Sequence, residues 1–306
     1  MLKKIIVGYD GSDHANDAFA LGAALAKATE AELFPTCVYH EPIPVPYGGY
    51  GSPQWDAGAR EQALKTAEHA PADAGVTTTP YAVASSSRPH GLYQLAATEH
   101  ADLVVVGSSR RAKHGPGLLG SVSHALLHGS PCAVAVAPPE FRHGQHRFET
   151  IGVAYDGEPE SEQALAKGIE LAKATGATLR IITLAMASEG GFEDAGFYQA
   201  GSAEQKQVMI DHMRALMDGA VERAKGAGVE AAGTLEVGTR ARLADQSGID
   251  LMLTGSRSYG PLRVALVGSV SRSLVDAGRF PVIVVPRSAE KSAEAEAEIS
   301  LGATTS

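Results

Sequence analysis

Two segments of identical sequence, Gly-Ser-Val-Ser at 120–123 and at 268–271, place a glycine and two hydroxyl groups where a helix is expected to begin. The first N–H groups of a helix have no intrahelical partner, and the helix dipole makes this end electropositive. Such a turn is a typical site for an anion, most often a phosphate group. The alternative is that Ser121 and Ser269 only cap their helices, because serine is a common N-cap residue.

An aspartate follows a short apolar run near the start of each half of the chain. Asp10 precedes Gly11, and Asp156 precedes Gly157. Aspartate before glycine is typical of a tight turn. Because both aspartates also stand at the end of a predicted strand, contact with a ligand is the second interpretation.

The anion-site segments and the aspartates belong to one long internal repeat. Three blocks recur in the same order with offsets of 146 to 148 residues: 5–11 and 151–157, 103–108 and 251–256, 119–123 and 267–271. Matched order at a nearly constant offset indicates a duplicated domain. The predicted organisation is a first domain at 1–139, a linker at 140–148, a second domain at 149–287 and a disordered tail at 288–306.

Each repeat alternates short apolar runs with Ala- and Leu-rich segments of helical periodicity. In the first repeat the expected strands are 3–9, 33–39, 76–83, 102–107 and 131–137, and the expected helices are 14–29, 56–73, 89–100 and 121–128. Continuous apolar strands are typical of a parallel sheet that is covered on both faces. The predicted fold class is α/β, with two tandem doubly wound domains that each hold a five-stranded parallel sheet. In such sheets ligands bind beyond the carboxyl ends of the strands, at the switch point in strand order.

A strand followed by Asp-Gly, and later by Gly-x-x-(Gly)-x9-Gly-(Ser/Thr), resembles the universal stress protein family in its tandem two-domain form. The resemblance covers about residues 3–138 and 149–287. It implies a Rossmann-like fold of the adenine nucleotide alpha hydrolase-like kind. In the branch of the family that binds ATP, the aspartate and a residue near the end of the second strand meet the adenine–ribose end, and the glycine-rich loop wraps the ribose and phosphates. The residues that this implies are Asp10, Val38, Gly107, Gly120, Ser121, Val122 and Ser123 in the first domain, and Asp156, Leu184, Gly255, Gly268, Ser269, Val270 and Ser271 in the second.

The chain departs from the family motif at its middle glycine, which is replaced by Arg110 in the first domain and by Ser258 in the second. Glycine would allow a positive φ and a close approach of the backbone to the nucleotide. The guanidinium of Arg110 can reach a phosphate instead, whereas Ser258 adds a side chain without a charge. Two functions therefore stay open. One is a sensor or regulator of the stress response that binds an adenine nucleotide, ATP with or without Mg²⁺, and the other is a nucleotide-free scaffold for protein partners.

Composition and missing motifs argue against several other functions. The net charge of −9 disfavours nonspecific nucleic-acid binding, and no apolar run approaches the ~18–20 residues of a membrane span. Two cysteines fit a reducing compartment, so we expect a cytoplasmic protein. There is no G-x-x-x-x-G-K-[ST] loop, and the G-x-G-x-x-G match at 115–120 starts eight residues beyond its strand. We expect no enzyme beyond slow ATP hydrolysis, and no metal site at the i, i+4 pair His124 and His128.

The resemblance also implies how the two domains meet, because domains of this family commonly pair edge to edge through their last strand. These strands are expected at 133–137 and 282–286. Because apolar edge strands need to be covered, we predict that the two pair within one chain as a pseudo-dimer. A homodimer of chains and an unidentified protein partner are further expectations.

Overall fold

The computed structural model describes residues 1–40, 53–71, 73, 75–108, 120–144, 146–186, 203–258, 265–266 and 268–286. The first half contains β1 (Lys4–Gly8), α1 (Asp13–Thr29), β2 (Glu32–His40), α2 (Pro53–Glu68), β3 (Tyr81–Ser85), α3 (Arg88–Thr98), β4 (Leu103–Gly107), α4 (Ser121–Gly129) and β5 (Ala133–Ala137). A 3-10 turn, η2 (Phe141–His143), follows. The second half contains β6 (Thr150–Ala154), α5 (Pro159–Thr175), β7 (Thr178–Met186), α6 (Ala203–Gly226), β8 (Ala231–Gly238), α7 (Ala241–Ala244), β9 (Leu251–Gly255), β10 (Arg257–Ser258), β11 (Ala265–Leu266), α8 (Ser269–Ala277) and β12 (Val282–Val285).

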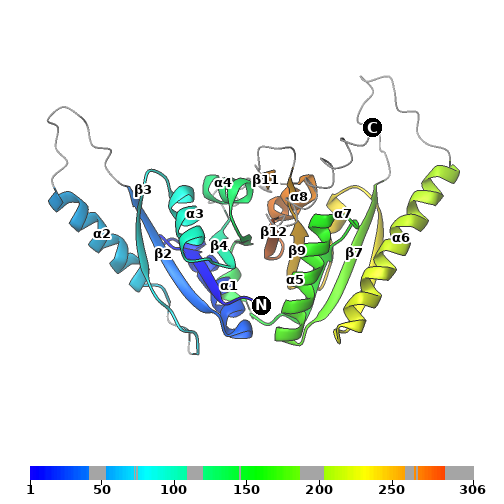
Figure 1. Cartoon of the computed structure of the whole chain (residues 1–306), viewed down its shortest axis with the longest axis horizontal. Coiled ribbons are helices and arrows are strands. Elements are labelled where there is room, and N and C mark those ends of the chain that lie inside the picture. Colours follow the sequence, from blue (N-terminus) through cyan, green and yellow to red (C-terminus); the bar gives the residue numbers. More distant parts are fainter. Residues whose placement is uncertain are drawn as a thin grey trace, which may run out of the picture.

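One ten-stranded sheet runs through both halves in the order β3-β2-β1-β4-β5-β12-β9-β6-β7-β8 (Figure 1). Within each half all neighbouring strands are parallel, as the continuous apolar strands predict. The chain runs from β1 outward to β3 and then returns to the other side of β1 as β4. The carboxyl ends of β1 and β4 therefore flank a switch point, and those of β6 and β9 flank its counterpart.

The two halves join through their last strands. β5 and β12 pair antiparallel, with Val134 opposite Val284 and Val136 opposite Val282. This confirms the predicted intramolecular pseudo-dimer, in which each apolar edge covers the other. The pairing leaves β3 and β8 at the edges of the sheet, and α2 and α6 lie at the two ends of the long axis (Figure 1).

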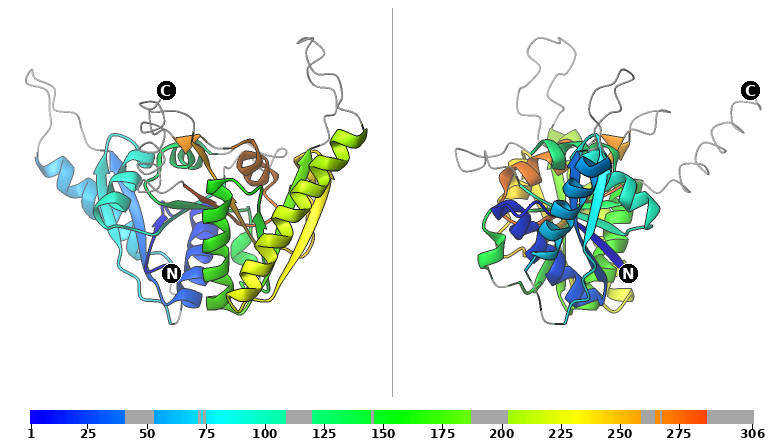
Figure 2. Two further views of the ribbon diagram at one scale, coloured as in Figure 1. Left: turned by 45° about the vertical axis from the view of Figure 1, so that its right-hand side comes forward. Right: turned by 90° about the vertical axis from the view of Figure 1, so that its left-hand side faces the viewer.

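Helices cover both faces of the sheet, as the side-chain alternation of the strands requires (Figure 2). On β1, Ile5 and Val7 point into one apolar core with residues of α1, α5 and α6, while Ile6 points into the other with residues of α3, α4, α7 and α8. Each core contains residues of both halves, so the apolar interior continues across the β5–β12 junction. All three of these side chains are fully buried.

The first half differs from the predicted elements around its third strand. The strand expected at 76–83 is regular only at 81–85. Before it, the chain makes a single bridge between Leu33 and Thr78, and Pro80, which has no N–H group, interrupts the ladder. The helix expected at 56–73 ends at Glu68, because Pro71 cannot continue it.

The segment between the halves is fixed to α1 by a buried carboxylate. Asp17, which is 1% exposed, accepts hydrogen bonds from the backbone N–H groups of Glu140 and Arg142, both at 3.1 Å. It also pairs with the guanidinium of Arg142 at 3.0 Å. Three donors compensate the buried charge. The predicted linker is thus docked on the first half, whereas the predicted tail at 288–306 lies outside the described residues.

Candidate functional site

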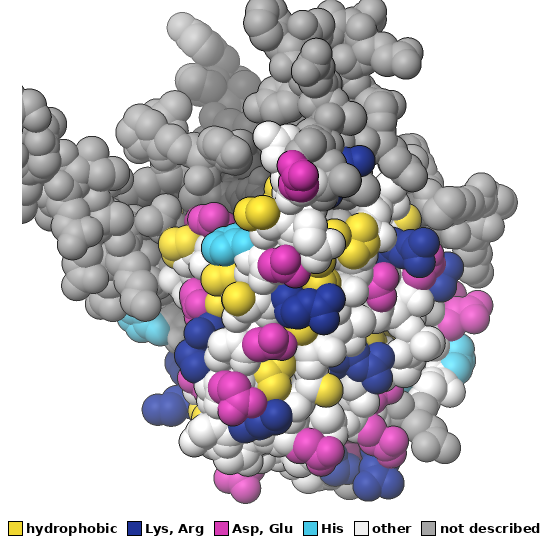
Figure 3. Space-filling model, turned by 90° about the vertical axis from the view of Figure 1, so that its right-hand side faces the viewer, with side chains coloured by type: hydrophobic (Ala, Val, Ile, Leu, Met, Phe, Trp, Pro, Cys, Tyr) yellow, Lys and Arg dark blue, Asp and Glu magenta, His cyan; other side chains and the backbone are white. Residues whose placement is uncertain are grey.

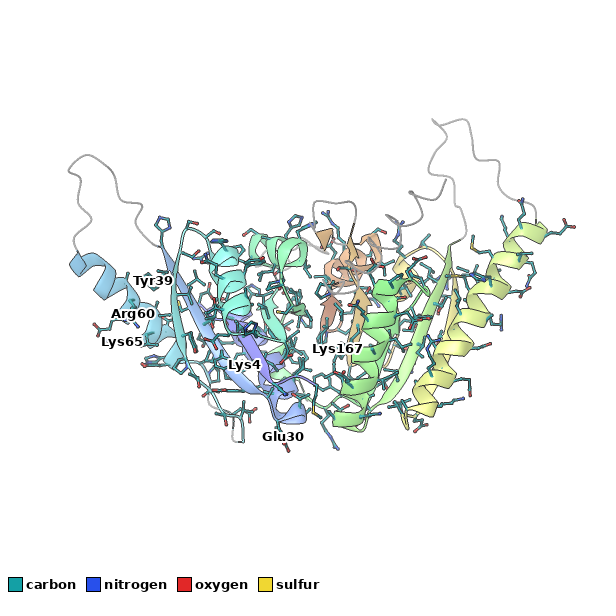
Figure 4. The ribbon with its side chains drawn as sticks, viewed as in Figure 1. Lys4, Glu30, Tyr39, Arg60, Lys65 and Lys167 are labelled. Carbon is teal, nitrogen blue, oxygen red and sulfur yellow. The ribbon has the colours of Figure 1, made fainter. Side chains whose placement is uncertain are left out.

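A pocket lies at each switch point, beyond the carboxyl ends of the strands. The first pocket, at β1 and β4, has a volume of about 360 Å³, and the second pocket, at β6 and β9, about 540 Å³. Both volumes are in the range of small-ligand sites. In Figure 4, Tyr39, near the carboxyl end of β2, marks the side of the molecule where the strands end. Glu30, which follows α1, marks the opposite side, where the strands begin.

The structure brings the predicted site residues of each half together around its pocket. The first pocket is lined by Asp10, Val38, Gly107, Gly120, Ser121, Val122 and Ser123, and the second by Asp156, Leu184, Gly255, Gly268, Ser269, Val270 and Ser271. Arg110 lies outside the described residues. Ser258 belongs to β10, whose backbone pairs antiparallel with β11, with Ser258 opposite Ala265.

The amino ends of α4 and α8 face these pockets. Gly120 and Gly268 are the N-cap residues, and neither helix has a side-chain capping bond. Ser121 and Ser269 are already the first helical residues, so the alternative that they only cap their helices is wrong. The first intrahelical bonds come from the N–H groups of residues 124 and 272, which leaves the preceding N–H groups without an intrahelical partner.

The second serine of each motif holds its helix against the neighbouring strand. Ser123 and Ser271 are 1% exposed, and their hydroxyls donate to the carbonyl oxygens of Gly107 and Gly255, each at 2.9 Å. These bonds fix the electropositive helix start beside the end of β4 or β9. A contact of either hydroxyl with a ligand stays a prediction.

The glycines that end β4 and β9 allow the first turn of a helix to come unusually close. A Cβ atom on Gly107 would lie 2.1 Å from the carbonyl oxygen of His14, and one on Gly255 would lie 2.6 Å from that of Glu160. No side chain fits at these distances. The glycines therefore place the first turns of α1 and α5 at the pockets, which is a packing role that the motif alone does not reveal.

Asp10 and Asp156 make the turns that lead into these helices. An Oδ1 of Asp10 accepts from the N–H of Ser12 at 3.1 Å, and Oδ1 of Asp156 accepts from that of Glu158 at 3.2 Å. The following glycines have positive φ values of 76° and 81°. The turn-making interpretation is confirmed, and because both aspartates also line the pockets, a carboxylate is present at each.

Two arginines at the pockets were missed by the sequence analysis. Arg88 lines the first pocket and Arg240 the second, and each directly follows a hydroxyl residue after the third strand of its half. A basic residue at this point in both repeats was the available signal. The pKa of the Cys37 thiol reflects the charges at the first pocket. Burial is the main cause that raises this pKa, the carboxylate of Asp10 raises it further, and the guanidinium of Arg88 lowers it.

Two buried polar atoms at the first pocket have no hydrogen-bond partner within the described part of the chain. They are Nδ1 of His14 and Oγ of Ser108, and both residues line the pocket. Ser256, the repeat counterpart of Ser108, has an unpartnered buried hydroxyl as well. Buried polar atoms are nearly always hydrogen-bonded, so the two atoms at the first pocket indicate a place for a polar ligand.

Other binding surfaces receive little support from the residues that the structure describes. These residues contain no group of three or more side chains that could hold a metal ion, and the rings of His124 and His128 lie 4.4 Å apart. None of the described helices has the combined length and apolarity of a membrane span. On the face shown in Figure 3, basic and acidic side chains interleave, so this face presents no extended basic surface.

Comparison with known proteins gives a consistent picture over nearly the whole chain. A model of the universal stress protein family matches residues 1–138 and 147–286. The universal stress protein Rv2005c of Mycobacterium tuberculosis is 29% identical over 295 residues, which are 93% of this chain and 97% of that protein. A universal stress protein of Thermus aquaticus is 36% identical over 138 residues, 44% of this chain and 97% of its own length. The solved structure of a universal stress protein from Archaeoglobus fulgidus has the same fold, with a TM-score of 0.62 at 20% identity, and the match covers 93% of this chain and 98% of that one.

Proposed function

The chain belongs to the universal stress protein family, and from this premise we propose that it binds an adenine nucleotide, ATP above all, at its switch-point pockets and acts as a sensor or regulator of the stress response. The observation that carries the proposal is the first pocket itself. There a helix start whose first N–H groups lack an intrahelical partner, an arginine, and two buried polar atoms without a partner among the described residues surround one cavity. These groups are suited to a ligand that carries phosphate.

The phosphate chain would lie at the start of α4. The N–H groups of residues 121–123 would donate to phosphate oxygens, with the helix dipole favouring the negative charge. The guanidinium of Arg88, which is exposed at the same pocket, would add charge-assisted hydrogen bonds. In the second pocket the start of α8 and Arg240 would take these roles.

The nucleoside would lie over the apolar side of the pocket. Val38, Leu92 and Val106 line the first pocket beside the polar groups and offer an apolar surface to a base. The carboxylate of Asp10 accepts hydrogen bonds only, which suits it to the hydroxyls of a ribose. Mg²⁺ would enter with the triphosphate, since phosphate oxygens and one or two carboxylates are its usual ligands, and Asp10 and Asp156 are the matching carboxylates.

We propose binding rather than turnover as the main activity. Among the described residues, the titratable side chains Asp10, His14 and Arg88 at the first pocket can hold a nucleotide. Efficient phosphoryl transfer needs a fixed metal and a base placed in line with the phosphate. Steady-state measurement of ATP hydrolysis by the full chain should therefore give slow rates, and turnover at rates typical of an ATPase would contradict this part of the proposal.

Isothermal titration of the full chain with ATP tests the proposal. Asp10→Ala and Ser121→Ala should each weaken binding at the first pocket, and the double variant Arg88→Ala/Arg240→Ala should weaken both pockets by about tenfold or more. Arg60→Ala is the matched control, because Arg60 lies on the outer surface of α2, away from the pockets (Figure 4). Unchanged affinity in all pocket variants would remove the assigned site. A wild-type chain that ignores millimolar ATP would instead support the nucleotide-free scaffold.

A further inference from the structure

The two pockets differ at two equivalent positions in the first turn of the helix that follows the Asp-Gly turn. With the offset of 146 residues, Ser12 corresponds to Glu158, and His14 corresponds to Glu160. All four residues line their pockets. The second half thus carries carboxylates where the first half carries a hydroxyl and an imidazole.

The structure supports this equivalence independently of the sequence offset. The backbone of His14 lies against Gly107, and the backbone of Glu160 lies against Gly255, each within 3 Å of where a Cβ atom on the glycine would be. Ser12 and Glu158 are the N-cap residues of α1 and α5. The exchange therefore changes the chemistry of one fixed place without changing its backbone frame.

The exchange gives the pockets different charges. Among the residues that the structure describes, the acid, imidazole and guanidinium side chains that line them are Asp10, His14 and Arg88 in the first, and Asp156, Glu158, Glu160 and Arg240 in the second. In the first pocket one carboxylate and one guanidinium cancel, and the imidazole offers a hydrogen-bond donor where the second half has a carboxylate. The described acid and guanidinium side chains that line the second pocket, three carboxylates and one guanidinium, sum to a formal charge of −2.

The second pocket is also larger than the first, and methionine side chains line part of it. Its volume is about 540 Å³ against about 360 Å³ for the first. Met209 and Met213 from α6 line it together with Leu184 and Leu243. Methionine side chains adapt to flat aromatic ligands and make favourable contacts with rings. The second pocket thus gains surface for a base, while its additional carboxylates make it less suited to the several charges of a triphosphate.

We propose that the two halves divide their ligands by charge, with the first pocket taking the nucleoside triphosphate and the second taking a nucleoside or nucleoside monophosphate. This inference rests on the proposed nucleotide binding. A triphosphate carries several negative charges, and each nearby carboxylate repels them, most strongly where water is excluded. His14, whose buried Nδ1 has no partner within the described residues, can instead donate to a phosphate oxygen. His14 and Glu160 are therefore the residues that determine the specificity of the two halves.

Hydrogen–deuterium exchange of the full chain with ATP, AMP or adenosine tests the proposal, because peptides of the two halves report separately. We expect ATP to protect peptides around 8–16 and 120–128 at least tenfold more strongly than the corresponding peptides around 154–162 and 268–276. AMP and adenosine should protect the second half at lower concentration than ATP does. The reciprocal variants His14→Glu and Glu160→His should lower ATP affinity at the first pocket and raise it at the second, each by about tenfold.

Two variants of the same residue types away from the pockets serve as controls. His100→Glu and Glu230→His alter exposed side chains that precede β4 and β8, at the amino ends of these strands, and should leave both protection patterns unchanged. Equal ATP protection of both halves, or reciprocal variants that behave as the wild type, would overturn the division by charge and leave nucleotide binding intact. If none of the three ligands protects either half, both this proposal and the proposed function are refuted.

Discussion

The substitution Gly107→Ala tests how the first pocket is built. The new Cβ atom would lie 2.1 Å from the carbonyl oxygen of His14 and 2.7 Å from its carbonyl carbon. Because both contacts are with backbone, no side-chain rotation relieves them, and α1 and β4 must separate by about 1 Å to reach even a short contact. The first turn of α1, with its pocket residues, would move with them.

The expected cost is large for a single methyl group. Overpacking costs about 1–3 kcal/mol and more where the neighbour cannot yield, so we expect the free energy of unfolding to fall by about 3 kcal/mol. For a cooperative unit of about 150–250 residues, a loss of about 3 kcal/mol corresponds to a decrease in Tm of about 6–12 °C. Gly255→Ala should behave alike, because its Cβ atom would lie 2.5 Å from the carbonyl carbon of Glu160.

Gly58→Ala is the matched control. Gly58 lies in α2, and a Cβ atom there would meet nothing within 4 Å. Alanine should therefore stabilise this helix by about 0.5–1 kcal/mol. Urea unfolding followed by circular dichroism measures all three variants. An unfolding midpoint of Gly107→Ala equal to that of the wild type would refute the close approach of α1 to β4.

Three further predictions follow from buried contacts. Asp17→Ala should lower the free energy of unfolding by about 2–4 kcal/mol, because it leaves the donors of the docked linker unpaired. Asp13→Ala, which removes an exposed carboxylate, should lower it by less than about 1 kcal/mol, and chemical unfolding of both variants measures the difference. Ser123→Ala should cost about 1–2 kcal/mol by the same assay, since a buried hydrogen bond of 2.9 Å is lost, and an unchanged midpoint would show that this bond does not hold α4. Burial raises the pKa of Cys132 to about 11, so little thiolate forms at pH 8. Iodoacetamide should therefore modify this thiol about 100-fold more slowly in the folded chain than in urea, as measured by mass spectrometry. Equal rates in the two conditions would contradict the burial of this thiol.

The repeat and the chemistry of its segments were sufficient to predict the fold. Matched blocks, apolar strands and helical periodicity lead to two parallel-sheet domains, and the family resemblance, together with the apolar character of 133–137 and 282–286, leads to the β5–β12 pairing. These properties are local or depend on one offset, so they can be read along the chain. The strand expected at 76–83 becomes regular only at 81–85, because Pro80 has no N–H group to donate to the ladder, even though the three preceding threonines have high strand propensity.

The candidate site was predictable only in part. The residues that follow the strands and open α4 and α8 were found, because their motif is contiguous. The contact of Gly107 with His14 joins residues 93 positions apart, and no spacing rule reveals it. Arg88 and Arg240 reach the pockets from a third segment, and the basic residue that both repeats carry there points to a pocket only once the strand order is known. The contrast between His14 and Glu160 becomes meaningful only once both are known to line pockets.

A crystal structure of the full chain grown with ATP is the most direct test of nucleotide binding at the switch points. We expect electron density for a triphosphate in the first pocket, with phosphate oxygens within hydrogen-bond distance of the N–H groups of residues 121–123 and of the Arg88 guanidinium. Crystals grown at saturating ATP in which the nucleotide lies elsewhere, or in which protein side chains fill that pocket, would contradict it.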